Sequence, residues 1–263
     1  MMAHDTTLAP ARNRSPDRPR RIVLYSHDTF GLGHLRRSRA LAVALTQANP
    51  DASAIILTGS PVAGRFTFPE RVDHIRLPGV TKLADGSYVS QTLGLDIDET
   101  TNLRAALIRS AIEQYDPDLL IVDKEPTGFR GELLPTLEMI RKTGHTRTVL
   151  GLRDVLDEPE VLAAEWDRKG ALDAAERFYD EVWVYGVKSV YDPTEGLALS
   201  DDLRSRMYWT GYLRRDRVES DEVPEDPYVL ITPGGGGDGA AMVNLVLAAY
   251  EQDPTLQPRA MLV

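Results

Sequence analysis

The stretch RIVLYSHDTFGLGHLRRSRALAVAL, residues 21–45, sets the pattern that the rest of the chain repeats. Residues 21–26 are mostly apolar and β-branched, which predicts a short buried strand. A loop with two glycines then leads to His34. Residues 35–45 carry apolar side chains at helical spacing, so they predict a helix that begins at the glycine loop.

The same alternation of strand and helix continues along the chain. It implies an α/β fold with a parallel sheet and helices on both faces. In such sheets the loops after the strands gather at one edge, where ligands bind. The polar stretch 81–100 has no clear period and is expected to be an irregular loop with a functional role. Further strands are predicted at 53–59, 72–79, 118–128 (running into a turn), 147–154, 180–186 and 206–213, and helices at 101–115, 131–144 and 158–179. On these strands Trp183, Tyr185, Tyr208 and Trp209 are expected in the core.

Composition divides the chain into four parts. Residues 1–20 are rich in arginine and proline and predict a disordered basic tail. Residues 21–213 form the first domain. Residues 214–227 are charged and interrupted by proline, as is typical of a linker. Residues 228–263 contain a strand, a glycine-rich loop, a helix and the beginning of another strand, which predicts the incomplete start of a second domain.

Bulk properties exclude several classes of protein. The chain has 263 residues and no cysteine, so disulfides and thiolate metal sites are absent. The histidines have no metal-ligand spacing, and we predict no metal. A net charge of −10 argues against nonspecific binding of nucleic acid. There is no apolar run long enough for a membrane span and no signal peptide, so we expect a cytoplasmic protein. The basic tail leaves open a peripheral contact with an anionic membrane surface.

The first glycine loop does not fit a nucleotide-binding fingerprint. Arg36 stands where a dinucleotide site needs its third glycine, and Ser60 lies where an acidic residue is expected after the second strand. What remains is a loop of Gly31 and Gly33 that delivers His34 to a helix N-terminus. A histidine placed there can act as a general base near neutral pH. The alternative is a turn whose histidine only caps the helix.

The second glycine loop lies between a strand and a helix. Gly234, Gly235, Gly236 and Gly237 let backbone N–H groups approach a ligand, and the helix N-terminus after them suits a phosphate. The alternative is a flexible joint between the strand and the helix.

Two further strand ends carry charged side chains. Asp123 and Glu125 follow the strand that begins at residue 118 and could hold a sugar hydroxyl or a base, although a salt-bridged loop is the alternative. Arg153 and Asp154 end the next strand and could form a structural ion pair or contact an acceptor. His27 lies near the same edge.

The order and spacing of these motifs resemble the GT-B glycosyltransferases. The likeness is closest to the MurG-like branch and to bacterial proteins described as predicted glycosyltransferases. The stretches LPGVTKLADGSYVS (77–90) and VDKEPTGFRGEL (122–133) also look like that group. The resemblance covers residues 21–250.

The resemblance implies two Rossmann-like domains that face each other across a cleft. The N-terminal domain would bind the acceptor, with Gly31, Gly33 and His34 in the cleft and His34 as a candidate base. The C-terminal domain would bind the nucleotide-sugar donor, commonly a UDP-sugar, and the loop from Gly234 to Gly237 would approach its phosphates. Enzymes of this branch work without an essential metal or another cofactor, and many invert the anomeric centre.

The expected function is transfer of a sugar from a nucleotide-sugar to an acceptor that the motifs do not identify. The chain stops after one helix of the second domain, so we expect little turnover from it alone. The alternatives are a noncatalytic module that binds a sugar or a partner protein, and an epimerase or hydrolase of sugar nucleotides. No motif predicts the oligomeric state.

Overall fold

The computed structural model describes residues 18–27, 32–83, 85–156, 158–214, 226–233 and 239–262. By its contacts the chain divides into two compact units, and the larger one contains residues 33–214. Of the predicted tail and linker, residues 1–17 and 215–225 lie outside the described residues. None of the helices in the described part is long and apolar enough to cross a membrane.

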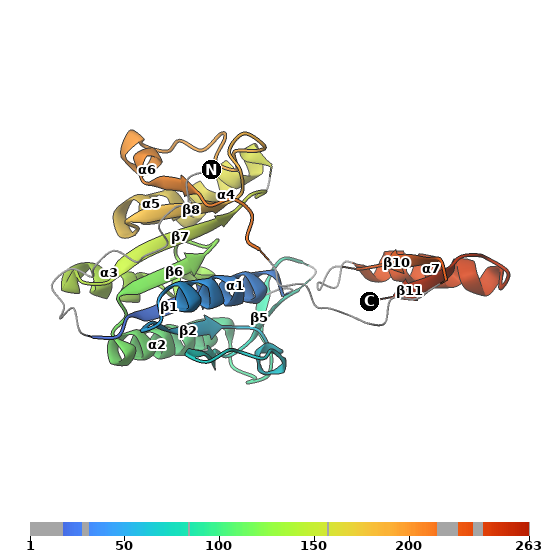
Figure 1. The fold of residues 1–263 in the computed structure, drawn as a ribbon, viewed down its shortest axis with the longest axis horizontal. Helices are drawn as coiled ribbons and strands as arrows, with labels where there is room; N and C mark the ends of the chain where they lie inside the picture. Colours follow the sequence, from blue (N-terminus) through green and yellow to red (C-terminus); the bar gives the residue numbers. More distant parts are fainter. Residues whose placement is uncertain are drawn as a thin grey trace. The chain divides into compact units, whose positions relative to one another are not determined.

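The larger unit is built on a seven-stranded parallel sheet with the order β3-β2-β1-β6-β7-β8-β9 (Figure 1). The first strand of the chain lies in the interior of the sheet, because β1 pairs with β2 on one side and with the much later β6 on the other. The predicted α/β fold class is confirmed. The strands are β1 (Arg21–Ser26), β2 (Ser53–Thr58), β3 (Val72–Arg76), β6 (Leu119–Asp123), β7 (Arg147–Arg153), β8 (Glu181–Tyr185) and β9 (Met207–Trp209).

Helices cover both faces of this sheet. The helix α1 (Gly33–Ala48) packs Leu35, Leu41 and Leu45 onto one face. The other face is covered by α2 (Ile97–Tyr115), α3 (Leu134–Thr143), α4 (Pro159–Lys169) and α5 (Ala171–Phe178). Strands buried on both faces are apolar along their whole length, which is why these segments could be predicted from the sequence.

Local residue chemistry sets the helix ends. Asp96 caps α2 and forms a capping box with Glu99, so the helix begins inside the stretch that was expected to be irregular. That stretch also contains an antiparallel hairpin of β4 (Val80–Lys82) and β5 (Tyr88–Ser90). The helix predicted over 158–179 is wrong as one element, because Gly170 adopts a left-handed φ of 61° and separates α4 from α5.

The remaining short elements are η1 (Ala63–Arg65), η2 (Phe129–Gly131) and α6 (Asp201–Ser205). Tyr185 is in the core as predicted, whereas Tyr208 on the edge strand β9 is 52% exposed and is not.

A buried ionic network ties α2 and β1 to the segment after β6. Arg104 of α2 donates through Nε and Nη2 to Glu132 at 2.6 and 2.7 Å, and neither side chain is exposed. The Tyr25 hydroxyl donates to Glu132 and accepts the backbone N–H of Phe129 at 3.0 Å. A further bond joins Arg104 to the carbonyl of Pro78 at 2.7 Å. The network therefore joins α2 and β1 to the backbone at Pro78 and Phe129.

The smaller unit contains a β-α-β arrangement. The strands β10 (Tyr228–Ile231) and β11 (Arg259–Leu262) run parallel, and α7 (Ala240–Gln252) lies between them in sequence. The helix has no buried residue although its sequence is largely apolar. The predicted strand, helix and second strand of this segment are therefore present.

Candidate functional site

The candidate site lies at the carboxyl edge of the central strands. His27 follows β1 directly, Asp123 ends β6, and Arg153 ends β7. Because these neighbouring strands are parallel, their ends meet at one edge of the sheet. The helix α1 begins close to the same edge, at Gly33.

His34 and Asp123 form a hydrogen-bonded pair at this edge. The Nδ1 atom of His34 lies 2.6 Å from Oδ2 of Asp123. The aspartate side chain is 3% exposed, whereas that of the histidine is 17% exposed. An ionised carboxylate only accepts hydrogen bonds, so Nδ1 is the donor. In the neutral ring Nε2 then has a free lone pair and can accept a proton.

Arg37 completes the surroundings of this carboxylate. It lies three residues after His34 on α1, a spacing that places both side chains on one face of the helix. Its Nε donates to Oδ1 of Asp123 at 2.8 Å and its Nη2 to Oδ2 at 3.0 Å. Burial alone would raise the pKa of Asp123, but hydrogen bonds from His34 and Arg37 outweigh it and lower that pKa. The carboxylate is therefore ionised at neutral pH.

Tyr185 packs beside the pair from β8. Its ring lies under the Arg37 guanidinium, with 5.8 Å between the Cζ atom and the ring centre. Its hydroxyl lies over Gly151, where an added Cβ would be 2.0 Å from the oxygen. Gly151 is the register partner of Asp123 on β7, so the glycine makes room for this ring next to the carboxylate. Burial and the nearby Asp123 charge raise the pKa of Tyr185 well above 10.0.

His27 lies against His34, with 4.6 Å between the ring centres. Burial lowers its pKa well below 6.5, and repulsion from His34 adds to the effect. Its Nδ1 atom is buried and has no hydrogen-bond partner in the described part of the chain. His27 is therefore a neutral ring at pH 7 that forms one wall beside His34.

The other predicted residues have different surroundings. Glu125 accepts from Lys169 of α4 at 3.0 Å and lies 3.9 Å from Lys124, so the salt-bridged loop is present. Asp154 packs its Cβ against Gly186. No ion pair joins it to Arg153 within the described residues.

The glycines of both loops fall mainly on undescribed positions. Gly33 is the first residue of α1 and has open space where a Cβ would lie. Gly31, Gly234, Gly235, Gly236 and Gly237 lie outside the described residues. Their predicted roles stay predictions.

Sequence reasoning missed Arg37, the packing of Tyr185 on Gly151, and the pairing of His34 with Asp123. Arg37 was detectable in principle, because its spacing from His34 on a predicted helix brings the two side chains together. The pairing with Asp123 depends on β1 lying next to β6, which no local pattern shows.

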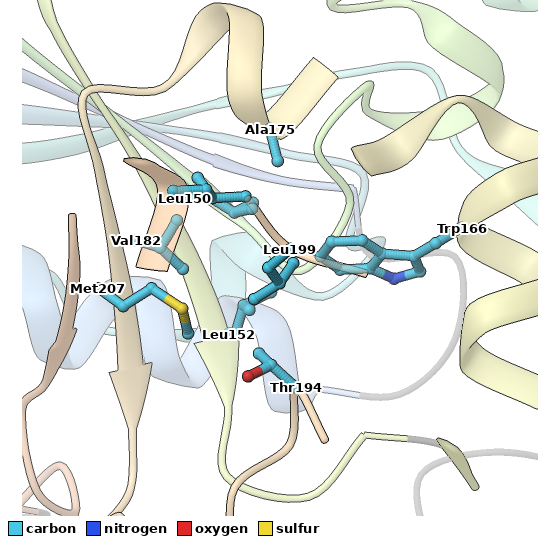
Figure 2. A pocket seen from close by; sticks show the side chains of 9 residues that line it. Leu150, Leu152, Trp166, Ala175, Val182, Thr194, Leu199 and Met207 are labelled. Atoms are coloured by element: carbon cyan, nitrogen blue, oxygen red, sulfur yellow. The ribbon is translucent and has the colours of Figure 1, made fainter. Parts of the chain in front are cut away.

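Two further observations on the described residues indicate no other ligand site. A cavity of about 10 Å³ lies between β7, β8 and α4 in the core on the side away from α1 (Figure 2). Its walls are almost entirely apolar, including Leu150, Trp166 and Met207, and its volume is near the minimum for one water. No group of three or more His, Cys, Asp or Glu in the described chain could hold a metal ion.

No family model and no curated protein sequence matches the chain. Among solved structures, the glycotransferase of kitacinnamycin matches 94% of this chain and 71% of its own, with a TM-score of 0.54 and 14% identity. HepE from Anabaena, in complex with UDP-glucose, matches 92% and 68% with a TM-score of 0.57 and 11% identity.

A third structure, a ugt transferase from Siraitia grosvenorii in complex with UDP, matches 88% of this chain and 62% of its own, with a TM-score of 0.50 and 12% identity. The chain thus spans 62 to 71% of the length of these three proteins. At this identity the likeness concerns the fold alone. The larger unit shares with these structures a Rossmann-like fold, in which a parallel sheet lies between helices.

Proposed function

We propose that the chain belongs to a glycosyltransferase that moves a sugar from a nucleotide-sugar to a hydroxyl group of an acceptor. The observation that carries this proposal is the His34–Asp123 pair at the carboxyl edge of a GT-B-type sheet. The fold likeness to structures that hold UDP or UDP-glucose supports a UDP-sugar donor. Assignment to the MurG-like branch and a bacterial origin are part of the same proposal.

In the proposed reaction His34 is the general base. Its Nε2 takes the proton of the acceptor hydroxyl while that oxygen attacks the anomeric carbon. The bond from this carbon to the nucleotide diphosphate breaks, and the leaving oxygen keeps the electron pair. A single displacement of this kind inverts the anomeric centre.

Asp123 acts as a positioning residue in this scheme. It holds the proton on Nδ1, so that Nε2 is the basic nitrogen, and it stabilises the imidazolium that forms. The two hydrogen bonds from Arg37 keep the carboxylate ionised and in place. This use of Asp123 replaces the direct contact with acceptor that its position in the sequence suggested.

The same proposal assigns the acceptor and the donor to different domains. Residues 21–213 would form the acceptor-side domain, with Gly33, Glu125, Arg153 and Asp154 near the acceptor. Residues 228–263 would open the domain that binds the donor, and the glycine loop at 234–237 would approach the donor phosphates. A reaction of the whole protein therefore needs donor-binding residues as well as those of the larger unit.

The test is acceptor-dependent release of nucleotide. A panel of nucleotide-sugars is incubated with the whole protein, donor-binding residues included, and a library of hydroxyl acceptors. UDP release and glycosylated product are followed by a coupled assay and mass spectrometry. His34→Ala should lower the transfer rate about 10²- to 10⁴-fold, the usual contribution of a general base.

The matched control is His145→Ala. His145 also pairs with an aspartate, with Nε2 2.8 Å from Oδ1 of Asp116, but it precedes β7 at the opposite edge of the sheet. It should leave the transfer rate unchanged. A His34→Ala variant with the full wild-type rate would refute the catalytic role. UDP release that does not depend on acceptor would favour the hydrolase alternative.

A further inference from the structure

Arg153, at the sheet edge that carries the candidate site, is a charged side chain with no partner among the described residues. Its Nε atom is buried and makes no hydrogen bond in the described part of the chain, where the residue also forms no ion pair. The residue as a whole keeps intermediate exposure. A guanidinium is always charged, and a buried donor without an acceptor costs free energy, so native structures rarely leave one.

Other buried or half-buried arginines of the larger unit are paired. Arg37 bonds Asp123 through two nitrogens, and Arg104 does the same to Glu132. Arg153 differs from them although it ends a central strand. This contrast indicates that its acceptor is not supplied by the described chain.

The position of Arg153 relates it to the proposed base. Gly151 is the register partner of Asp123, and Arg153 lies two residues further along β7. Residues two apart on a strand share a face, and their Cα atoms are about 7 Å apart. Arg153 is therefore on the same face as Asp123, one step outward toward the strand end.

A second unpartnered polar atom lies at the same place. Tyr185 is the register partner of Arg153 on β8, and its buried hydroxyl makes no hydrogen bond among the described residues. This oxygen lies over Gly151, which is the register partner of Asp123 and precedes Arg153 by two residues on β7. Among the described residues, two hydrogen-bond donors at register-paired positions thus have no acceptor.

The carboxylates described at this edge of the sheet make no ion pair with Arg153. Asp123 is bound by His34 and Arg37, and Glu125 is bound by Lys169. Asp154 follows Arg153 directly but makes no ion pair with it in the described structure. Within the described residues, the charge of Arg153 is therefore unmatched, at the same strand edge as the proposed base.

We propose that Arg153 binds an oxyanion, a carboxylate or a phosphate, carried by the acceptor whose hydroxyl faces His34. The planar guanidinium fork matches the two oxygens of such a group. The inference rests on the proposed function only in placing the acceptor at the His34–Asp123 pair. It assigns the acceptor to a chemical class, that of anionic hydroxyl compounds.

The test measures binding and needs no turnover. Ligand-observed NMR titrations use the full chain and two matched pairs of probes: 4-hydroxybenzoate with its methyl ester, and glycerol 3-phosphate with glycerol. UDP is titrated separately, because its diphosphate is the other source of the same chemistry. The variants are Arg153→Met, Arg153→Lys and the control Arg76→Met. Arg76 is exposed and ends the edge strand β3 of the same sheet.

Wild-type protein should bind at least one anionic probe more tightly than its neutral partner. Arg153→Met should weaken that binding about tenfold or more, the effect of losing a charge-assisted hydrogen bond, and should leave UDP binding within about twofold. Arg153→Lys should retain part of the affinity, and Arg76→Met all of it. Removal of an unpaired charge should not lower the unfolding temperature, whereas loss of a structural contact would.

Three results would overturn the inference. They are a wild-type protein that binds neither anion, an Arg153→Met variant that binds both anions as the wild type does, and a loss that falls on UDP. The last result would assign Arg153 to the donor phosphates. These readings are independent of turnover. If the whole protein binds anions through Arg153 but shows no transfer, the proposed transfer is contradicted and this inference stands.

Discussion

Replacing Glu132 by glutamine perturbs the one buried ionic network that joins α2, β1 and the segment after β6 among the described residues. Glu132 accepts two hydrogen bonds from Arg104 and one from Tyr25, and both charged side chains are fully buried. Glutamine keeps the shape of the side chain. It removes the negative charge, however, and turns one acceptor into an N–H₂ donor that faces the guanidinium.

The expected loss of stability follows from this geometry. Breaking a buried ion pair while one partner stays charged costs about 3–5 kcal/mol. For a unit of this size each kcal/mol corresponds to about 2–4 °C in the unfolding temperature, so Glu132→Gln should lower it by about 6–20 °C. The exposed pair of Arg109 and Glu113 on the same helix is the control, and Glu113→Gln should cost less than about 1 kcal/mol.

Urea unfolding followed by tryptophan fluorescence reports the stability of the larger unit, where the substitution lies. All three tryptophans, at 166, 183 and 209, lie in the larger unit. A double variant, Arg104→Met with Glu132→Leu, should recover much of the loss, because it removes both charges. The reasoning would be refuted by a Glu132→Gln variant within about 1 kcal/mol of the wild type.

Two further predictions concern the walls of the site. Gly151→Ala should force the Tyr185 ring away from β7 and cost about 1–3 kcal/mol by overpacking, whereas Gly64→Ala, with open space around it, should be near neutral in the same urea assay. His27 has a lowered pKa in the folded state, so its contribution to stability is complete above pH 6.5 and is lost as the pH falls below that value toward the folded pKa. His27→Gln should therefore flatten the decrease in the urea midpoint between pH 7.5 and 5, and a variant that keeps the wild-type slope would argue against a buried neutral ring.

Much of the fold was predictable because buried parallel strands are apolar along their whole length. Each of the seven strands of the sheet lies within a predicted stretch. The ends were less predictable, as Gly170 shows, because one left-handed residue breaks a helix whose apolar spacing continues across it. The cap of α2 at Asp96 was missed since the capping box lies inside a polar stretch without a period.

Two residues of the candidate site were singled out from the sequence, but their arrangement was not. His34 lies at the start of the helix after the first strand and Asp123 at the end of a later strand, and that placement drew attention to them. Their contact joins positions 89 residues apart and exists only because the chain returns to place β6 beside β1. Arg37 was overlooked because a charged residue on a helix usually faces solvent, and only the contact with Asp123 gives it another role.

The most direct measurement of the central claim is the tautomer of His34. Long-range ¹H–¹⁵N NMR of the imidazole rings at pH 8, assigned with His34→Ala, reports which nitrogen carries the proton. We predict the Nδ1–H form with a bare Nε2, and a shift toward the Nε2–H form in Asp123→Asn. A wild-type ring protonated on Nε2, or a spectrum that Asp123→Asn leaves unchanged, would contradict the assignment of His34 as the base.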